Sequence, residues 1–418
     1  MPVDIGGGVI ADTVGDLLSP PTEFLEVEAA LEMPRLPDTP EPPPCGIHFG
    51  MDEETYHAIP AFSKSHLHHL LCSPTAFWAD SWLNPDREDR SAEHLHVGKA
   101  YHAMILEGHD AYTSRFYPAP DPKDYPQALR SVDEIKQALD KLHQTPVSKV
   151  PVPGTEGKTR AAKKEDWVAP LLAYDRSQLV WDDIVAKAER IAAGRTLLPC
   201  ADDRRIRIAA RMIMQDPQLA KAFSGGFPEV VLIWRDPRQG VLCKSRVDYL
   251  KLRAVVDFKT FANKQDRSVR KAILHAIAEH RYCLQPAVYL SGVDAVRKLV
   301  RERGKDAIFV HGGFRRYEDG ALALDDPQPA IEFATKWAEN TTPDRWLWVF
   351  QMKGEAPVTR GLWHPLASTV HSFSQSLFVE GLRKFRELAE IYGNDPWLDL
   401  AEVDDIDESE VPMWGIDF

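Results

Sequence analysis

The chain has 418 residues, of which 44% are apolar and 27% charged, so it can bury a large core as one large domain or as two ordinary ones. No run approaches the roughly 18 uninterrupted apolar residues that a membrane helix needs, and the N-terminal stretch is acidic where a signal peptide would be basic. The five cysteines are widely spread and include no CxxC pair, which disfavours a zinc or iron–sulfur centre. We therefore expect a soluble, cytoplasmic protein without a membrane partner.

The formal net charge of −13 argues against a nucleic-acid partner until the position of the charge is considered. Residues 1–46 carry −8, residues 391–418 carry −9, and residues 47–390 carry +4. The body is therefore mildly basic, which permits a groove for phosphates. We expect 1–46, which is acidic and rich in proline, to be a disordered arm, 47–390 to be the folded domain, and 391–418 to be an acidic tail with an aromatic end. The tail is a solvated segment, a docking peptide for a partner, or a mimic of DNA phosphates that occupies the protein's own groove.

Helices are predicted in the first part of the body. The stretch FSKSHLHHLLCSP predicts a capped helix that ends before Pro74, and Thr75 to Trp82 predicts a second one. The next helix is expected near 92–107, where Gly98 and His102 lie four residues apart on one face. Glycine at that place lets another backbone or a ligand approach the imidazole.

Residues 118–165 are rich in proline, lysine and turn-forming residues, and they predict a long loop region with one helix near Asp133 to His143. Two amphipathic helices are expected after it, near 181–193 and 202–215. Cations of the loop region can line a path for DNA or can belong to a solvated loop. They include Lys158, Arg160, Lys163 and Lys164.

The periodicity of the sequence then changes to that of strands. The runs PEVVLIW (228–234), VLCKSRVDYL (241–250) and AVVDFKT (254–260) are rich in strand-forming residues. Turn residues, DPRQG (236–240), separate the first two runs. An antiparallel meander is the structure that this pattern predicts.

One register explains why acids stand in these strands. If Asp248 lies opposite Asp257, the two carboxylates share one face with Lys259, because opposed residues project to the same side. A slip by one residue would break this arrangement, and the register needs an even number of residues in the link. The apolar neighbours would then share the core face; they are Val247, Tyr249, Val256 and Phe258.

Two carboxylates opposed at about 5 Å repel one another unless a cation lies between them. An ion pair with Lys259 and Arg246 is one solution. A divalent metal is the other, since hard oxygen ligands suit Mg²⁺ or Mn²⁺. Such an ion would lower the pKa of a bound water and neutralise charge on phosphorus, while Lys259 orients or deprotonates the water or stabilises the pentacovalent state.

The pattern Asp-x8-Asp-x-Lys is that of the PD-(D/E)XK nucleases, and the segments around it form an ordered series. In chain order these segments are SKSHLHHLLCSPTAF, GKAYHAMILEG, PEVVLIW, CKSRVDYL, VVDFKT, YCLQPAVYLSG and WLWVFQMKGEAPV. Together they resemble the nuclease domain of the exodeoxyribonuclease VIII (RecE-like) type, which is related to RecB-like and lambda-exonuclease-like nucleases. The resemblance covers about residues 50–380.

The resemblance implies roles for the matched positions. Asp248 and Asp257 match the metal-binding acids of the family, and Lys259 matches its catalytic lysine. Many members of the wider superfamily have glutamate where this chain has Asp257, so the shorter side chain changes the reach to the metal. His102 would come to the metal site as a ligand or a phosphate contact, and the main-chain carbonyl of Phe258 would be a further ligand.

Further positions match less simply. Gln285 and Tyr289 match a Q-x-x-x-Y helix that contacts the DNA end, and a four-residue spacing places both on one helical face. Pro286 requires this helix to start near Gln285 or to kink there. Glu229 matches an acid that opens the meander, and it either helps to bind metal or is a solvated residue at a strand edge.

The expected fold is α/β, with a PD-(D/E)XK nuclease-like central mixed sheet that carries the antiparallel meander. Helices near 92–107 and 282–297 would flank it, with a further strand near 345–353 and a long helix near 368–391. The resemblance implies a Mg²⁺-dependent (or Mn²⁺-dependent) exodeoxyribonuclease with two ions during catalysis. It would resect linear duplex DNA ends 5′ to 3′ and leave a 3′ single strand for recombination or repair. A ring-shaped homo-oligomer and a RecT-like single-strand annealing partner are also implied.

Three alternatives remain open. The first is a catalytically silent DNA-binding or assembly module of the same fold, which the intact Asp248, Asp257 and Lys259 disfavour. The second is a structure- or sequence-specific endonuclease in a defence or recombination system, which closed circular and linear DNA would distinguish. The third is an unrelated α/β protein with a chance motif.

Overall fold

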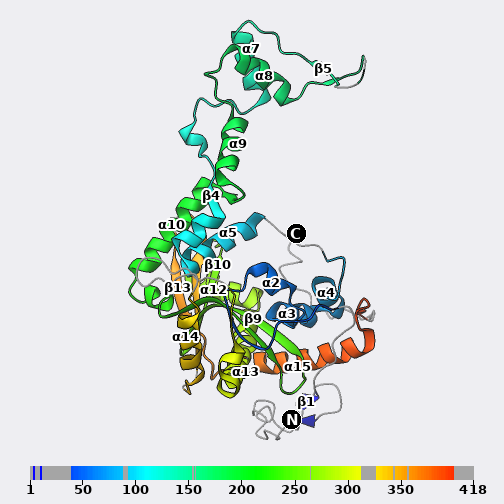
Figure 1. The fold of residues 1–418 in the computed structure, drawn as a ribbon, viewed down its shortest axis with the longest axis vertical. Helices are drawn as coiled ribbons and strands as arrows, with labels where there is room; N and C mark the ends of the chain where they lie inside the picture. The colour runs from blue at the N-terminus through cyan, green and yellow to red at the C-terminus, as the bar shows by residue number, and fades with distance from the viewer. Residues whose placement is uncertain are drawn as a thin grey trace.

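A seven-stranded mixed sheet forms the centre of the computed structural model (Figure 1). The structure describes residues 39–87, 93–152, 155, 157–263, 265–311, 326–341, 344–354 and 357–399, and the backbone of two short strands, β1 (Val3–Asp4) and β2 (Ile10–Ala11). The strands of the central sheet are β3 (Gly46–Phe49), β8 (Gly226–Arg235), β9 (Leu242–Lys251), β10 (Ala254–Phe261), β11 (Ile308–Val310), β12 (Arg345–Met352) and β13 (Thr359–Trp363). Their order across the sheet is β11-β3-β8-β9-β10-β12-β13.

The predicted meander is the central part of this sheet. β3, β8, β9 and β10 are antiparallel neighbours, whereas β10 pairs with β12 in parallel. The turn between β8 and β9 is held by Asp236, whose side chain accepts hydrogen bonds from the backbone N–H groups of Arg238 and Gln239. The predicted α/β class, with a central mixed sheet, an antiparallel meander and flanking helices, is confirmed.

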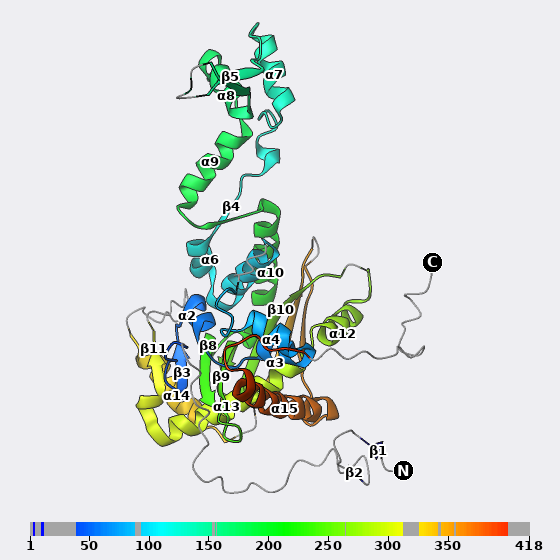
Figure 2. The same cartoon turned by 90° about the vertical axis from the view of Figure 1, so that its right-hand side faces the viewer.

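Helices cover both faces of the sheet (Figure 2). On one face the helices pack in a large hydrophobic cluster; they are α3 (Lys64–Cys72), α4 (Pro74–Asp80), α12 (Val269–Glu279), α13 (Leu284–Arg303), α14 (Gln328–Ala338) and α15 (Thr369–Tyr392). The other face carries α2 (Glu53–Ala58), α5 (Glu93–His102), the π-helix η1 (Ala103–Glu107), α6 (His109–Arg115), α10 (Cys200–Gln215) and α11 (Leu219–Ala222). A 3-10 turn, η3 (Gly304–Ala307), leads into β11. None of the helices within the described residues is long and apolar enough to cross a bilayer.

Helix α13 approaches the sheet closely and is fixed there by a buried arginine. A Cβ on Gly292 would lie 2.6 Å from the ring of Trp234, so only glycine permits this approach. Arg297, which is 4% exposed, donates to the carbonyls of Trp337 and Leu252 at 3.1 Å each and pairs with Asp344. These contacts join α13 to the link between β9 and β10 and hold the helix against the sheet.

A projection formed by residues 119–195 extends away from the sheet (Figures 1 and 2). The chain enters it after β4 (Phe116–Pro118) and returns through β7 (Thr196–Leu198), which pairs with β4 in parallel. Its elements are η2 (Pro122–Asp124), α7 (Val132–Lys141), β5 (Lys149–Pro151), β6 (Thr159–Ala161), α8 (Lys164–Tyr174) and α9 (Trp181–Ala192). The predicted helix is confirmed as α7, but the rest of the predicted loop region is a folded unit. It has its own small core of Ile135, Leu139, Trp167 and Leu171.

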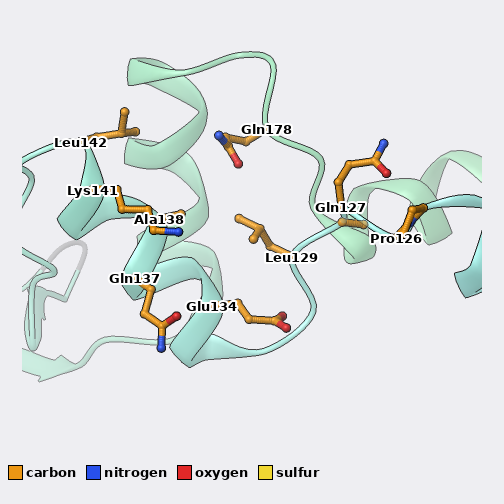
Figure 3. A pocket seen from close by; sticks show the side chains of 10 residues that line it. Pro126, Gln127, Leu129, Glu134, Gln137, Ala138, Lys141, Leu142 and Gln178 are labelled. Carbon is orange, nitrogen blue, oxygen red and sulfur yellow. The ribbon is translucent and has the colours of Figure 1, made fainter.

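The projection contains a pocket of about 310 Å³. Figure 3 shows α7 as one wall of this pocket and the segment that contains Leu129 as another. Three glutamines contribute much of the polar lining of the pocket: Gln127, Gln137 and Gln178.

The chain stays in the folded body beyond the predicted end of the domain at residue 390. After α15, Trp397 is fully buried, and its ring centroid lies 4.8 Å from that of Phe77. Its main-chain carbonyl accepts a hydrogen bond from the Thr75 hydroxyl at 2.7 Å. The predicted start of the acidic tail at residue 391 is therefore too early, because burial of an indole outweighs the acidic composition around it. Residues 400–418, and most of the predicted arm at 1–46, lie outside the described residues.

Buried histidines predict that acid weakens the fold. His48 on β3 is fully buried, and this burial lowers its pKa from 6.5 to about 4. The unfolded chain therefore binds more protons below pH 6.5, so stability falls as the pH drops towards 4, by about 2 kcal/mol at pH 5 from this group. We expect His48→Gln to reduce the difference in unfolding free energy between pH 7.5 and pH 5, measured by urea denaturation. His109→Gln, at an exposed position of α6, is the matched control and should keep the wild-type difference; an equal difference in all three proteins would contradict the prediction.

Candidate active site

The predicted register of β9 and β10 is the register that the structure shows. Val255 pairs with Leu250 and Val256 pairs with Tyr249, with only Leu252 and Arg253 in the link between the strands. If the same register continues to the next residue of each strand, Asp257 lies opposite Asp248. The backbone pairing stops at that point, so the two acids stand where the strands part.

The carboxylate of Asp248 takes the place of a backbone acceptor. Its Oδ2 atom accepts a hydrogen bond from the main-chain N–H of Phe258 at 2.7 Å. In an antiparallel ladder a strand N–H normally donates to a carbonyl of the neighbouring strand. Asp248 is 8% exposed, and its side chain satisfies this N–H and holds the parted strands together.

Asp257 and Lys259 lie on the face of β10 that α13 covers. Asp257 is 1% exposed, and its Oδ1 atom accepts hydrogen bonds from Lys259 Nζ at 2.7 Å and from Gln285 Nε2 at 2.5 Å. Lys259 Nζ also lies 3.9 Å from Asp248 Oδ2, so the two carboxylates converge on one ammonium group. The second oxygen of Asp257, Oδ2, is buried and has no hydrogen-bond partner.

The electrostatic state of the three groups follows from burial and mutual charge. Burial raises the pKa of Asp257 to about 6, because the attraction of Lys259 offsets only part of the desolvation and the charge of Asp248 opposes ionisation. Burial alone would lower the pKa of Lys259, but the charges of Asp257 and Asp248 raise it well above its usual value. Without a metal, Lys259 is therefore an ammonium that donates hydrogen bonds rather than a base.

His102 approaches Asp248 and Glu229 from the opposite face. It is the last residue of α5, and the chain continues directly into the π-helix η1, a geometry that is frequent at functional sites. Its Nδ1 atom lies 3.7 Å from Glu229 Oε1 and 4.0 Å from Asp248 Oδ2. Burial lowers the pKa of His102, but Asp248 and Glu229 outweigh it and the net shift is upward. The space beside Gly98, one helical turn before His102, is open, since a Cβ on Gly98 would meet no atom within 4 Å.

Glu229 has a strained backbone inside the sheet. Its φ is +52°, a left-handed conformation that residues other than glycine adopt rarely. It stands between the pairs Pro228–Tyr249 and Val230–Val247, opposite Asp248, and its Oε2 atom lies 2.9 Å from Arg246 Nε. The expectation of a solvated glutamate at a strand edge is therefore wrong, because β8 is an inner strand and the carboxylate is paired.

This strain also changes which apolar residues share a face. Tyr249, Val256 and Phe258 lie together in the hydrophobic cluster on the α5 side, as predicted. Val247, which was expected with them, lies in the cluster on the α13 side. Regular alternation is interrupted between Val247 and Tyr249, opposite the left-handed residue of β8.

The oxygen atoms of the site fit a hard divalent cation. Asp257 Oδ2 is a buried anionic oxygen without a donor, which is the environment that a cation would complete. Within the described residues, no group of three or more His, Cys, Asp and Glu side chains is arranged to hold a metal ion. Mg²⁺ does not need such a group, because it is commonly bound by one or two carboxylates, waters and substrate phosphates. Asp248, Asp257 and the main-chain carbonyl of Phe258 can supply the protein ligands.

The structure brings some of the other predicted residues to this site and leaves others away from it. α13 begins at Leu284, so Pro286 falls in the first turn, where its missing N–H is tolerated, and Gln285 reaches Asp257. Tyr289 lies one turn further along, partly buried, with its ring centroid 5.7 Å from that of Trp346.

The predicted basic cluster lies on the projection, away from the two aspartates (Figure 1). Arg160 is paired with Asp166 at 2.6 Å, and Lys164 with Asp182 at 2.8 Å. Lys158 and Lys163 are exposed at the same end. Their part in DNA binding remains a prediction.

Two residues near the site were not anticipated from the sequence. The ring of Tyr282 lies 5.6 Å from Lys259 Nζ and 5.8 Å from Lys64 Nζ. Tyr282 stands three residues before Gln285, which was the available signal, whereas no sequence feature indicates that Lys64 lies here.

No family model matches the sequence, and no curated protein matches it. Among solved structures, the chain is similar to the crystal structure of a "Putative exonuclease" from Eubacterium rectale. The TM-score is 0.38 and the sequence identity is 14%, over 80% of this chain and 86% of that one. At this level of similarity, the functional assignment depends on the geometry of the site itself.

The raised pKa of Asp257 predicts that its charge destabilises the metal-free fold. The folded pKa of about 6 exceeds the ordinary 3.8, so the carboxyl of Asp257 stays protonated to a higher pH in the folded protein than in the unfolded chain. The stability of the fold therefore falls as the pH rises between these values. We expect Asp257→Asn to be more stable than wild type at pH 7 in EDTA and to lose this advantage at pH 4.

Thermal unfolding measures both effects, and Asp395→Asn at an exposed position is the control. Mg²⁺ should raise the Tm of wild type and of the control, and raise that of Asp257→Asn less. If Asp257→Asn is less stable than wild type at pH 7 in EDTA, the charge of Asp257 does not destabilise the metal-free fold and the prediction is wrong.

Proposed function

We propose that the protein is a metal-dependent DNA exonuclease that hydrolyses phosphodiesters at duplex ends. The observation that supports this most is the convergence of Asp248 and Asp257 on Lys259, with one buried carboxylate oxygen left without a partner. Two acids and an ammonium in this order fit the hydrolysis of phosphodiesters with a divalent ion. Resection from 5′ to 3′, which leaves a 3′ single strand, rests on the RecE-like resemblance.

The residues that would bind the metal and the substrate come from both faces of the sheet. Asp248, Asp257 and the Phe258 carbonyl would hold Mg²⁺ or Mn²⁺, with two ions during catalysis, and His102 would be a further ligand or a phosphate contact. When bound, the metal lowers the pKa of a water and neutralises charge on the phosphoryl oxygens. Gln285 fixes the carboxylate of Asp257 by its hydrogen bond.

Lys259 acts as a positive charge in this proposal. Its ammonium donates to Asp257 and faces Asp248, so it is placed to orient a nucleophilic water or to stabilise the charge that develops on phosphorus. The raised pKa that its two anionic neighbours impose makes a proton-abstracting role less suitable in the metal-free site.

The partners belong to the same proposal. Linear duplex ends are the substrate, a ring-shaped homo-oligomer would enclose the DNA, and a RecT-like annealing protein would receive the single strand. These features come from the resemblance of the ordered motifs, and a cytoplasmic location is proposed from the sequence composition.

Replacement of Lys259 tests the mechanism. We expect Lys259→Met to reduce cleavage of end-labelled linear duplex in Mg²⁺ by at least about 10²-fold, because a positioned donor to the transition state is lost. Binding to the same duplex in EDTA, measured by fluorescence anisotropy, should stay within a few-fold of wild type. Lys298→Met, which changes an exposed lysine of α13, should leave both quantities unchanged.

The form of the DNA separates an exonuclease from an endonuclease. Wild type should degrade linear duplex and leave covalently closed circles intact, and EDTA should stop the reaction. Cleavage of closed circles would favour the endonuclease alternative.

For the Lys259 test, equal cleavage by wild type and Lys259→Met would remove the lysine from the mechanism.

A further inference from the structure

A second cation lies next to the site on the side of α3. Lys64 is the first residue of α3, which Ser63 caps by accepting a hydrogen bond from the His66 N–H on its side-chain oxygen. Lys64 Nζ lies 5.8 Å from the Tyr282 ring centroid and donates to the main-chain carbonyl of His280 at 3.3 Å. Lys259 Nζ lies 5.6 Å from the same ring. Two ammonium groups therefore lie within 6 Å of the centre of one aromatic ring.

Arg281 adds a third positive charge at the same place. It stands in the turn between α12 and α13, exposed, with a left-handed φ of +47°. The charges of Lys64 and Arg281 both act on the neighbouring His68, after burial, to lower its pKa. Arg281 stands between His280, whose carbonyl accepts from Lys64, and Tyr282, whose ring lies next to Lys64, so Lys64 and Arg281 belong to one cluster that joins α3 to the start of α13.

The two added cations of the cluster are not neutralised by ion pairs. Among the described residues, neither Lys64 nor Arg281 forms an ion pair with a carboxylate, whereas Lys259 has two. Burial and the repulsion of Lys259 and Arg281 together lower the pKa of Lys64 to about 8, because Asp257 compensates only in part. Neighbouring cations without anions are an unfavourable arrangement that a bound anion would stabilise.

We propose that Lys64 and Arg281 form a phosphate-binding subsite beside the metal centre, which holds a phosphate of the cleaved strand other than the one that is hydrolysed. The site deepens the proposed function and rests on it, because it assumes that the substrate is a nucleic-acid strand. Lys259 contacts the acids of the metal centre, while Lys64 contacts the His280 carbonyl before the start of α13. Because the two ammonium groups have these different neighbours, they can face different phosphates of one strand. The strand would then pass along the start of α3 and the turn before α13.

Salt dependence of binding tests the subsite directly. Each phosphate contact contributes about −0.9 to the slope of log K against log salt concentration for duplex DNA. We expect Lys64→Met and Arg281→Met each to make this slope less negative by up to about 1 in EDTA, where cleavage is stopped. In Mg²⁺, the KM for linear duplex should rise about tenfold with kcat within about threefold, as for loss of uniform binding. Lys271→Met, at an exposed position of α12, should match wild type in all of these measurements.

A neutral phosphate analogue distinguishes contact from a structural effect. A duplex with one methylphosphonate next to the scissile phosphate should bind wild type about as weakly as the unmodified duplex binds Lys64→Met. The same substitution should weaken Lys64→Met little further, because the contact is already lost. Circular dichroism should show that each variant keeps the wild-type helix content.

The outcomes separate the two proposals. If wild type cleaves linear duplex but Lys64→Met and Arg281→Met keep its salt slope and KM, the subsite is refuted and the nuclease assignment stands. Additive effects of the analogue and the Lys64 substitution would refute it as well. If wild type neither binds nor cleaves DNA, the proposed function fails and the subsite fails with it.

Discussion

The hydrogen bond from the Phe258 N–H to the Asp248 carboxylate is the contact on which the site depends. It lets β9 and β10 part without leaving a buried donor unsatisfied, since a side-chain oxygen replaces a ladder carbonyl. The register of the paired residues before it places Asp257 opposite Asp248, and the parting of the strands gives both acids access to the same space. Without this contact, the strands would either continue to pair and close the site or expose a buried N–H at a cost of about 1 to 3 kcal/mol.

Charge balance accounts for the other polar residues around the acids. Each carboxylate of the site has a cation within 4 Å: Lys259 for Asp257 and Asp248, and Arg246 for Glu229. His102 lies between Glu229 and Asp248 and gains a raised pKa from them. The left-handed backbone at Glu229 costs about 1 to 3 kcal/mol, and the interactions of its carboxylate with Arg246 and His102 help to maintain it. The metal-free site is thus held together by protein cations that a divalent ion can partly replace.

The sequence predicted what depends on periodicity and local chemistry. The meander, its register and its two-residue link follow from alternation, and the start of α13 at Leu284 follows from the restriction that Pro286 imposes. The position of Val247 could not be predicted, because it depends on a left-handed conformation at Glu229 that glutamate rarely adopts. Burial of Trp397 and the approach of Lys64 to Tyr282 depend on packing between segments far apart in the chain, which periodicity does not report.

The site is built from two hydrophobic clusters that meet at the parted strands, and this determines how it responds to change. Gln285 comes from the cluster on the α13 side and His102 from the cluster on the α5 side, while the acids stand on the strands between them. The distance between Gln285 and Asp257 is set by how closely α13 packs on the sheet, which the contact of Gly292 with Trp234 and the network of Arg297 control. Packed interiors transmit strain rather than absorb it. A methyl group added at Gly292 would therefore act on the hydrogen bond of Gln285 two helical turns away, although it touches none of the polar residues.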